Sequence, residues 1–276
     1  MPAVDPAPSE VRTNGIDIVD VEVAFATDDR SVLTAVAGVT QHVEPGSFVS
    51  IVGPSGCGKS TLLNVVAGLQ APSKGHVTIG TRRVAGPNRS LGIVFQEEST
   101  LPWKTVLGNV RFGMSVAGVS KAEQVRRAAA MIDLVGLDGF EQSYPAQLSG
   151  GMRQRVAIAR TLAMDPDVLL MDEPFGALDQ QTRIILGGEL LRIWEATGKT
   201  VLFVTHDIQE AVLLSRQVWV MSYRPGRIID VVDIDLPDHR DTTIVSTPRF
   251  NQLSNQIWDV VRAEAMLGFA QEERST

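Results

Sequence analysis

A glycine-rich loop between an apolar run and a helical pattern constrains this chain more than any other segment. Residues 47–52 form a short apolar run, which leads into Gly53-Pro-Ser-Gly-Cys-Gly-Lys59-Ser60 and so matches G-x-x-x-x-G-K-[ST] at every fixed position. Residues 59–69 then follow a helical pattern. Glycines let the backbone curl until successive N–H groups point at phosphate oxygens, and the helix start adds the positive end of its dipole. The alternative is a glycine-rich turn without a ligand, and the flanking strand and helix argue against it.

This loop predicts a site for a nucleotide with Mg²⁺. Lys59 can reach the outer phosphates as a point charge, and the Ser60 hydroxyl can bind the metal. We interpret Cys57, the single cysteine of the chain, as a small packing residue, because the sequence positions nothing basic except Lys59 to activate its thiol. The residues expected to bind ATP in this loop are Gly53, Pro54, Ser55, Gly56, Cys57, Gly58, Lys59, Ser60 and Thr61.

Short apolar runs alternate with helical patterns along much of the chain. These runs are residues 91–95, 168–171, 201–204 and 218–221. Such alternation is typical of an α/β domain with a mainly parallel sheet. Residues 16–25 instead alternate between apolar and polar side chains, as in a half-buried strand. Residues from about 97 to 160 are predicted to be helical with no clear strand, which makes them an insert in the α/β domain.

The organisation predicted for the whole chain has three parts. Residues 1–14 contain three prolines and little apolar periodicity, and we expect a disordered leader. Residues 15–236 are expected to form the main domain, with the helical insert and a helix over 182–197. Residues 237–276 are expected to be a tail with one amphipathic helix over 251–267.

The charge and hydropathy of the chain exclude some classes of function. The net charge is −7, from 25 basic and 32 acidic residues, which argues against nucleic acid as a partner. No basic start followed by an apolar segment indicates a signal peptide, and no run approaches the ~18 apolar residues of a spanning helix. We therefore expect a soluble, cytoplasmic chain.

Two adjacent carboxylates follow one of the predicted buried strands. Residues 168–171 end in Asp172-Glu173-Pro174. The carboxyl end of a parallel strand is where ligand sites of α/β sheets lie. Asp172 would hold Mg²⁺, and Glu173 would polarise the attacking water as a general base. The alternative is a strand end with two solvated acids that bind nothing, and the presence of a phosphate loop in the same chain argues against it.

The segment Leu148-Ser-Gly-Gly-Met152 resembles the signature of ABC ATPases, and the other motifs follow that family's order. The order along the chain is phosphate loop, Gln96, signature, Asp172-Glu173, residues 176–179 and His206. The resemblance covers residues from about 16 to 230. It implies an α/β fold: a P-loop NTPase (RecA-like) core with a mostly parallel sheet, an N-terminal antiparallel β part and an inserted α-helical subdomain.

The resemblance also implies roles for single residues. Gln96 would bind Mg²⁺ or the attacking water at a subdomain hinge, and His206 would contact the γ-phosphate and orient water. Asp179 would shape a dimer contact, and Phe25 would stack on adenine. The sequence departs from the family at Met152, where many members carry glutamine, but it keeps the serine and glycines of the signature.

The signature has a physical interpretation of its own. Ser149, Gly150 and Gly151 would open a helix running towards Ala163, and the exposed N–H groups of a helix start form an anion site. Ser149 would also serve as an ordinary helix cap. The resemblance implies that two copies of the chain pair head to tail, so that each signature closes over the ATP of the other copy.

Finer similarities favour import over other functions of the family. Residues 95–97, 101–106, 171–179, 191–194 and 205–208 look like the nitrate, sulfonate and taurine group of importers. This implies uptake of a small anion, at the cytoplasmic face of the membrane, with integral permease subunits and an extracytoplasmic solute-binding protein. A soluble ABC ATPase without a transport function and an exporter subunit remain the alternatives. Trp103 is expected either to dock on the permease or to pack inside the helical insert.

Overall fold

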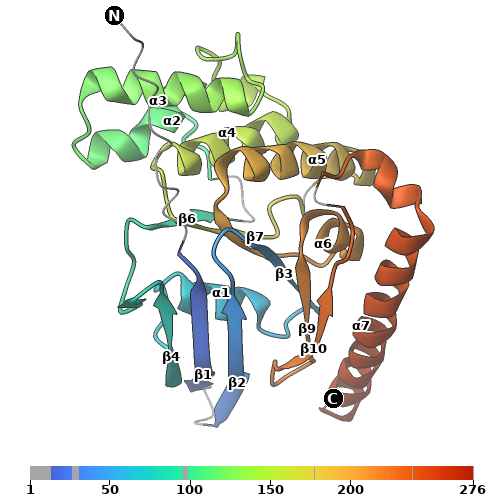
Figure 1. Cartoon of the computed structure of the whole chain (residues 1–276). Coiled ribbons are helices and arrows are strands. Elements are labelled where there is room, and N and C mark those ends of the chain that lie inside the picture. Colours follow the sequence, from blue (N-terminus) through green and yellow to red (C-terminus); the bar gives the residue numbers. More distant parts are fainter. Residues whose placement is uncertain (1–13, 27–30, 96–98, 177, 238, 276) are drawn as a thin grey trace, which may run out of the picture.

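The computed structural model describes residues 14–26, 31–95, 99–176, 178–237 and 239–275, with side chains up to residue 270. The leader predicted over residues 1–14 lies outside this range except for Asn14, and so does Gln96. The molecule has two sheets, a group of helices at one end, and further helices between and beside the sheets (Figure 1).

The larger sheet carries the predicted parallel strands. Its strand order is β10-β9-β3-β8-β7-β6. All neighbouring strands pair in parallel except β10, which pairs antiparallel with β9. The strands are β3 (Phe48–Val52), β6 (Leu91–Val94), β7 (Val168–Asp172), β8 (Thr200–Val204), β9 (Gln217–Met221) and β10 (Ile228–Asp233). The apolar runs predicted as buried strands are thereby confirmed, and the fold is the expected α/β class.

The smaller sheet is antiparallel and has the order β2-β1-β4-β5. Its strands are β1 (Ile16–Ala26), β2 (Val32–Val43), β4 (Lys74–Ile79) and β5 (Arg82–Arg83). The sequence pattern identified β1 but not its neighbours. In β2 the alternation is broken at Gly38, which has a φ of 62°, and the pairing of β1 with β2 shifts register around Val21 and Val23. A period of two is lost across such irregularities.

Helix α1 (Lys59–Val66) lies between the two sheets, below the glycine-rich loop. One core cluster joins its side chains to residues from the inner faces of both sheets. Leu62 and Val66 are fully buried there, and burial of such side chains contributes about 1.5–3 kcal/mol each. The start of α1 is therefore fixed against both sheets, which places the loop at the carboxyl end of β3.

Three helices lie together at one end of the molecule (Figure 1) and occupy the range predicted to be helical. They are α2 (Val106–Val116), α3 (Lys121–Leu134) and α4 (Gly150–Leu162), with a short 3-10 helix η1 (Pro145–Gln147) before α4. Side chains of Thr105, Ser120 and Ser149 accept hydrogen bonds from the first turns of these helices. Each such cap is worth about 1 kcal/mol, which explains where the helices begin.

The remaining helices cover the other face of the larger sheet and its edge. They are α5 (Gln180–Thr197), α6 (Ile208–Leu214), the 3-10 helix η2 (Thr242–Ser246) and α7 (Pro248–Ser275). The helix predicted over 251–267 is confirmed but extends further at both ends, and it packs through Phe250, Leu253 and Ile257. In the described part of the chain no helix has the length and apolar character needed to cross a bilayer.

Candidate functional site: a nucleotide pocket at the phosphate loop

The glycine-rich loop takes the conformation that its glycines permit. Gly58 has a φ of 104° and precedes α1, and a Cβ there would lie 2.8 Å from the carbonyl oxygen of Ala35. No side chain caps this helix start. Backbone N–H groups of the first turn are consequently left for a ligand, as an anion-binding helix start requires.

Lys59 spans the loop from the inside. Its ammonium group donates to the carbonyl oxygens of Gly53 and Pro54, at 3.0 Å each, and only 6% of the residue is exposed. A buried ammonium group held at the floor of a loop of backbone donors attracts polyphosphate strongly. Cys57 is fully buried beneath it, and burial raises the pKa of its thiol. This agrees with the interpretation of Cys57 as a packing residue, because a protonated buried thiol is a poor nucleophile.

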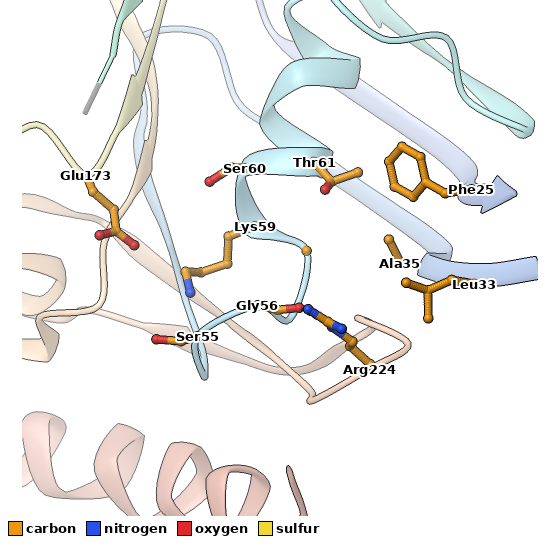
Figure 2. A pocket seen from close by; sticks show the side chains of 11 residues that line it. Phe25, Leu33, Ala35, Ser55, Gly56, Lys59, Ser60, Thr61, Glu173 and Arg224 are labelled. Carbon is orange, nitrogen blue, oxygen red and sulfur yellow. Dashed lines mark hydrogen bonds between the residues drawn. The ribbon is translucent and has the colours of Figure 1, made fainter. Parts of the chain in front are cut away.

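The loop borders a cavity of about 450 Å³ (Figure 2). Phe25 of β1 and Leu33 and Ala35 of β2 form its apolar wall, and Glu173 lies across the loop from them. The cavity is also lined by Ser55, Gly56, Gly58, Lys59, Ser60, Thr61 and Arg224. An aromatic wall beside a phosphate loop suits a nucleotide, whose nucleobase can stack on the ring while its phosphates lie in the loop. Gly53, Pro54 and Cys57 belong to the loop but do not line the cavity.

Ser60 and Asp172 form a pair suited to Mg²⁺. The Ser60 hydroxyl donates to the Asp172 carboxylate at 2.9 Å, and burial raises the pKa of Asp172. A partly buried carboxylate with one hydroxyl partner is a good place for a cation. Among the described residues no group of three or more His, Cys, Asp or Glu could cage a metal. Mg²⁺ is usually held by one or two protein oxygens together with phosphates and water, so these two residues fit it.

Glu173 and His206 meet at the adjacent strand ends. His206 Nδ1 lies 2.8 Å from Glu173 Oε2, and the backbone N–H of Glu173 donates to Val204 on β8. Glu173 has a φ of 41°, a left-handed conformation that is strained for a glutamate and that often marks functional sites. The side chain is thereby turned into the cavity.

Other predicted site residues lie away from the cavity. Ser149 accepts a hydrogen bond from the N–H of Met152 at 3.3 Å, and Asp179 accepts from Thr182 at the start of α5. Both side chains act as helix caps in the single chain, with Gly150 and Gly151 in the first turn of α4. The hydrogen bonds from Thr182 lower the pKa of Asp179. None of these residues lines the cavity, and Gln96 lies outside the described residues.

The sequence patterns missed three residues of the cavity wall. Leu33 and Ala35 belong to β2, which the alternation did not reveal, and Arg224 follows β9 in a turn. The Pro-Gly pair after Arg224 signals a turn in the sequence, but nothing local indicates that the turn reaches the phosphate loop.

Comparisons with known proteins agree with this geometry. Residues 36–176 match the model of the ABC transporter family. A nitrate import ATP-binding protein of Synechocystis is 44% identical over 90% of this chain and 95% of its own length. A taurine import ATP-binding protein of Rhizobium johnstonii is 46% identical over 85% of this chain and 92% of its own length.

A solved structure shares the fold at a sequence identity of 32%. It is a dimeric ATP-binding cassette in a post-hydrolysis state bound to ADP and Pi, with a TM-score of 0.70 over 80% of this chain and all of that one. The match of sequence, fold and pocket leads to one assignment. The chain belongs to the ABC transporter family and is one of its ATP-binding, ATP-hydrolysing proteins.

Proposed function

We propose that this ATPase is the ATP-hydrolysing subunit of an importer for a small anion, such as nitrate, taurine or another sulfonate. The observation that carries the proposal is an exposed apolar surface on the helical end of a chain whose described part holds no spanning helix. The names of the nitrate and taurine relatives support import and an anionic solute.

The exposed apolar residues of this end include Trp103, whose exposed fraction is 71%. Phe112 and Val116 stand one turn apart on α2, with exposed fractions of 41% and 73%, and Lys104 lies over the Phe112 ring at 5.5 Å. The exposure of Trp103 disagrees with packing inside the helical insert and favours docking. Clustered exposed apolar side chains mark contact sites, and aromatic residues dominate their energy. A permease helix is the occupant that we propose.

Docking here can be linked to the ATP site. Arg160 of α4 donates to the carbonyl oxygen of Ser99 at 2.6 Å. Ser99 is separated from Gln96 by two residues, so this bond ties the helix of the signature to the segment assigned to the hinge. We propose that a permease acting on the Trp103 surface would act, through Ser99 and Arg160, on the helix that carries the signature.

The chemistry proposed for the site assigns one task to each group. Glu173 polarises the attacking water as a general base. His206, whose Nδ1 lies 2.8 Å from Glu173 Oε2, orients that water and contacts the γ-phosphate together with Gln96. Lys59 binds the outer phosphates and Phe25 stacks on adenine. Mg²⁺, held by Ser60, Asp172 and Gln96, would neutralise charge on the phosphates.

The signature completes the site from a second copy of the chain. Ser149, Gly150 and Gly151 lie outside the cavity of their own chain, and so does Asp179, the N-cap residue of α5. A head-to-tail dimer would bring them over the partner's ATP, and the dimeric state of a similar cassette supports pairing of two copies. We further propose that the dimer works at the cytoplasmic face of the membrane and receives its solute from an extracytoplasmic binding protein.

The test isolates the tagged chain from native membranes and identifies the proteins bound to it. The proposal expects integral permease subunits with wild type and with Trp258→Glu, a matched change at an exposed tryptophan of α7. Trp103→Glu should lose them while its ATPase activity and melting temperature stay unchanged. A wild-type chain that binds no membrane protein would support a soluble ABC ATPase. Transport of labelled nitrate or taurine is then measured in both directions with vesicles. Uptake identifies an importer, and efflux identifies an exporter.

A further inference from the structure

Arg224 lies on the cavity wall although no nucleotide-binding motif includes it. Its Nε donates to the carbonyl oxygen of Gly56 at 2.7 Å. A Cβ at Gly56 would lie 2.8 Å from Nη2 of the same guanidinium, so the guanidinium packs closely against the backbone of the loop at a glycine. Figure 2 shows the Arg224 side chain reaching the loop at Gly56.

This hydrogen bond orients a peptide group of the phosphate loop. In a trans peptide the carbonyl and the following N–H point in opposite directions. With the Gly56 carbonyl turned out to Arg224, the N–H of Cys57 points into the loop, where it is 3.4 Å from the carbonyl oxygen of Pro54. Such a long bond is weak, which leaves that N–H available for a phosphate oxygen.

The residue next to Arg224 is held by the C-terminal helix. The backbone N–H of Tyr223 donates to Glu264 Oε2 at 2.9 Å. The Tyr223 ring packs on α7 at Gly268, where a Cβ would lie 2.7 Å from Cδ2 of the ring. Two contacts from α7, more than forty residues away in sequence, therefore hold the residue before Arg224, while Gly226 on its other side is hydrogen-bonded to Ala35 and Ala37 of β2.

We propose that Arg224 is a positioning residue of the ATP site and that α7, through Glu264 and Gly268, sets its position and so the affinity for ATP. The proposal rests on the ATPase assignment but adds a residue and a structural element that the family motifs do not contain. It gives the C-terminal tail a role in nucleotide binding.

The first test measures the dissociation constant for ATP, by displacement of a fluorescent ATP analogue, together with KM, kcat and melting temperature. Arg224→Ala in the full chain should raise the dissociation constant and KM about tenfold, the loss expected for one charge-assisted hydrogen bond. Its kcat at saturating ATP and its melting temperature should not change. Arg227→Ala, which removes the same charge from the same turn, is the control and should match wild type.

A lysine variant separates position from charge. Arg224→Lys keeps the charge but not the planar Nε donor, so it should remain as weak as the alanine variant. Full rescue by lysine would overturn the positioning role, and an unchanged dissociation constant in Arg224→Ala would overturn the whole proposal. An inactive wild-type chain would instead contradict the ATPase assignment, so the two failures are distinguishable.

The second test perturbs α7 alone. Glu264→Ala should raise the dissociation constant for ATP about threefold, because it removes one hydrogen bond to the Tyr223 N–H, while Glu264→Gln keeps an acceptor and stays near wild type. Gly268→Ala should raise it as well, although alanine favours a helix over glycine. A purely structural helix would predict no loss of affinity there. Arg262→Ala on α7 is the control, and unchanged affinity in both Glu264→Ala and Gly268→Ala would refute the role of α7.

Discussion

The starts of α1 and α4 are both glycine-rich helix N-termini, yet the surroundings of the two differ. At α1 the N-cap residue is Gly58, no side chain caps the helix, and Lys59, Glu173 and the Phe25 wall border a cavity. At α4 the N-cap residue is Ser149, whose hydroxyl already accepts the N–H of Met152. The start of α1 is left without a side-chain cap, so its N–H groups are available to a ligand of the same chain. At the start of α4 the Ser149 hydroxyl already accepts one N–H, and the cavity of the same chain does not reach it.

The difference fits our proposal that each chain holds one ATP site and supplies a second surface to the site of a partner copy. An anion site needs donors, positive charge and a wall that excludes water. The start of α1 has all three, whereas that of α4 has donors and the guanidinium of Arg153 but does not border this cavity. Each of the following experiments would break or sharpen this comparison.

The largest effect is expected at the α1 side, from Glu173→Gln. The change removes the proposed general base but keeps size and hydrogen bonding to His206, so kcat should fall about a thousandfold while ATP still binds. Size-exclusion chromatography with MgATP should show a stable dimer. Undiminished hydrolysis would remove Glu173 from the proposed mechanism, and a monomer with bound ATP would contradict the two-chain site.

The buried carboxyl group of Glu210, on α6, makes the free energy of unfolding depend on pH. Burial raises its pKa to about 7 from 4.5, and it accepts a hydrogen bond from Thr205, beside His206. Between these values the folded chain keeps a proton that the unfolded chain loses, so the free energy of unfolding should fall as pH rises, by about 3 kcal/mol in all. Urea unfolding at pH 5 and pH 8 measures this.

Glu210→Gln is the matched variant for the pH experiment. Glutamine is uncharged at both pH values and its amide oxygen can still accept from Thr205. Its free energy of unfolding should change less between pH 5 and pH 8 than that of wild type. An equal slope for both proteins would assign the pH dependence to other groups.

Lys59→Ala tests the ground-state attraction of the loop. Loss of the ammonium group removes charge-assisted contacts to phosphate, and the dissociation constant for ATP should rise on the order of 100-fold. Isothermal titration with the isolated chain gives the value, and Lys121→Ala at the solvent-exposed start of α3 serves as the control. Wild-type affinity in Lys59→Ala would mean that the loop binds no nucleotide.

The smallest effect is expected at α4, from Ser149→Ala. Losing the cap should lower the free energy of unfolding by about 1 kcal/mol without changing ATP affinity in the isolated chain. Glycine caps a helix almost as well as serine, so Ser149→Gly should keep stability. If both variants reduce the MgATP dimer formed in the Glu173→Gln background, the hydroxyl contacts the partner's ATP. Reduced ATP affinity in the monomer would contradict the comparison.

The sequence predicted most of what is local. The phosphate loop, the buried strands and the cap at Ser149 depend on spacing within a few residues, where backbone sterics and hydrogen bonding decide the outcome. The strand β2 escaped prediction because Gly38 and the register shifts of its pairing destroy the period of two. Nothing local compensates for that loss.

The sequence by itself determined that the chain has a nucleotide loop, two carboxylates at a strand end and a second glycine-rich helix start. Only the tertiary structure decided what these meet. It brought Ser60 to Asp172 at 2.9 Å, left Trp103 71% exposed and placed Arg224 on Gly56. The physical reason is that such contacts join segments from different elements, whose mutual placement follows from the packing of α1 between two sheets and of α7 against the last strands.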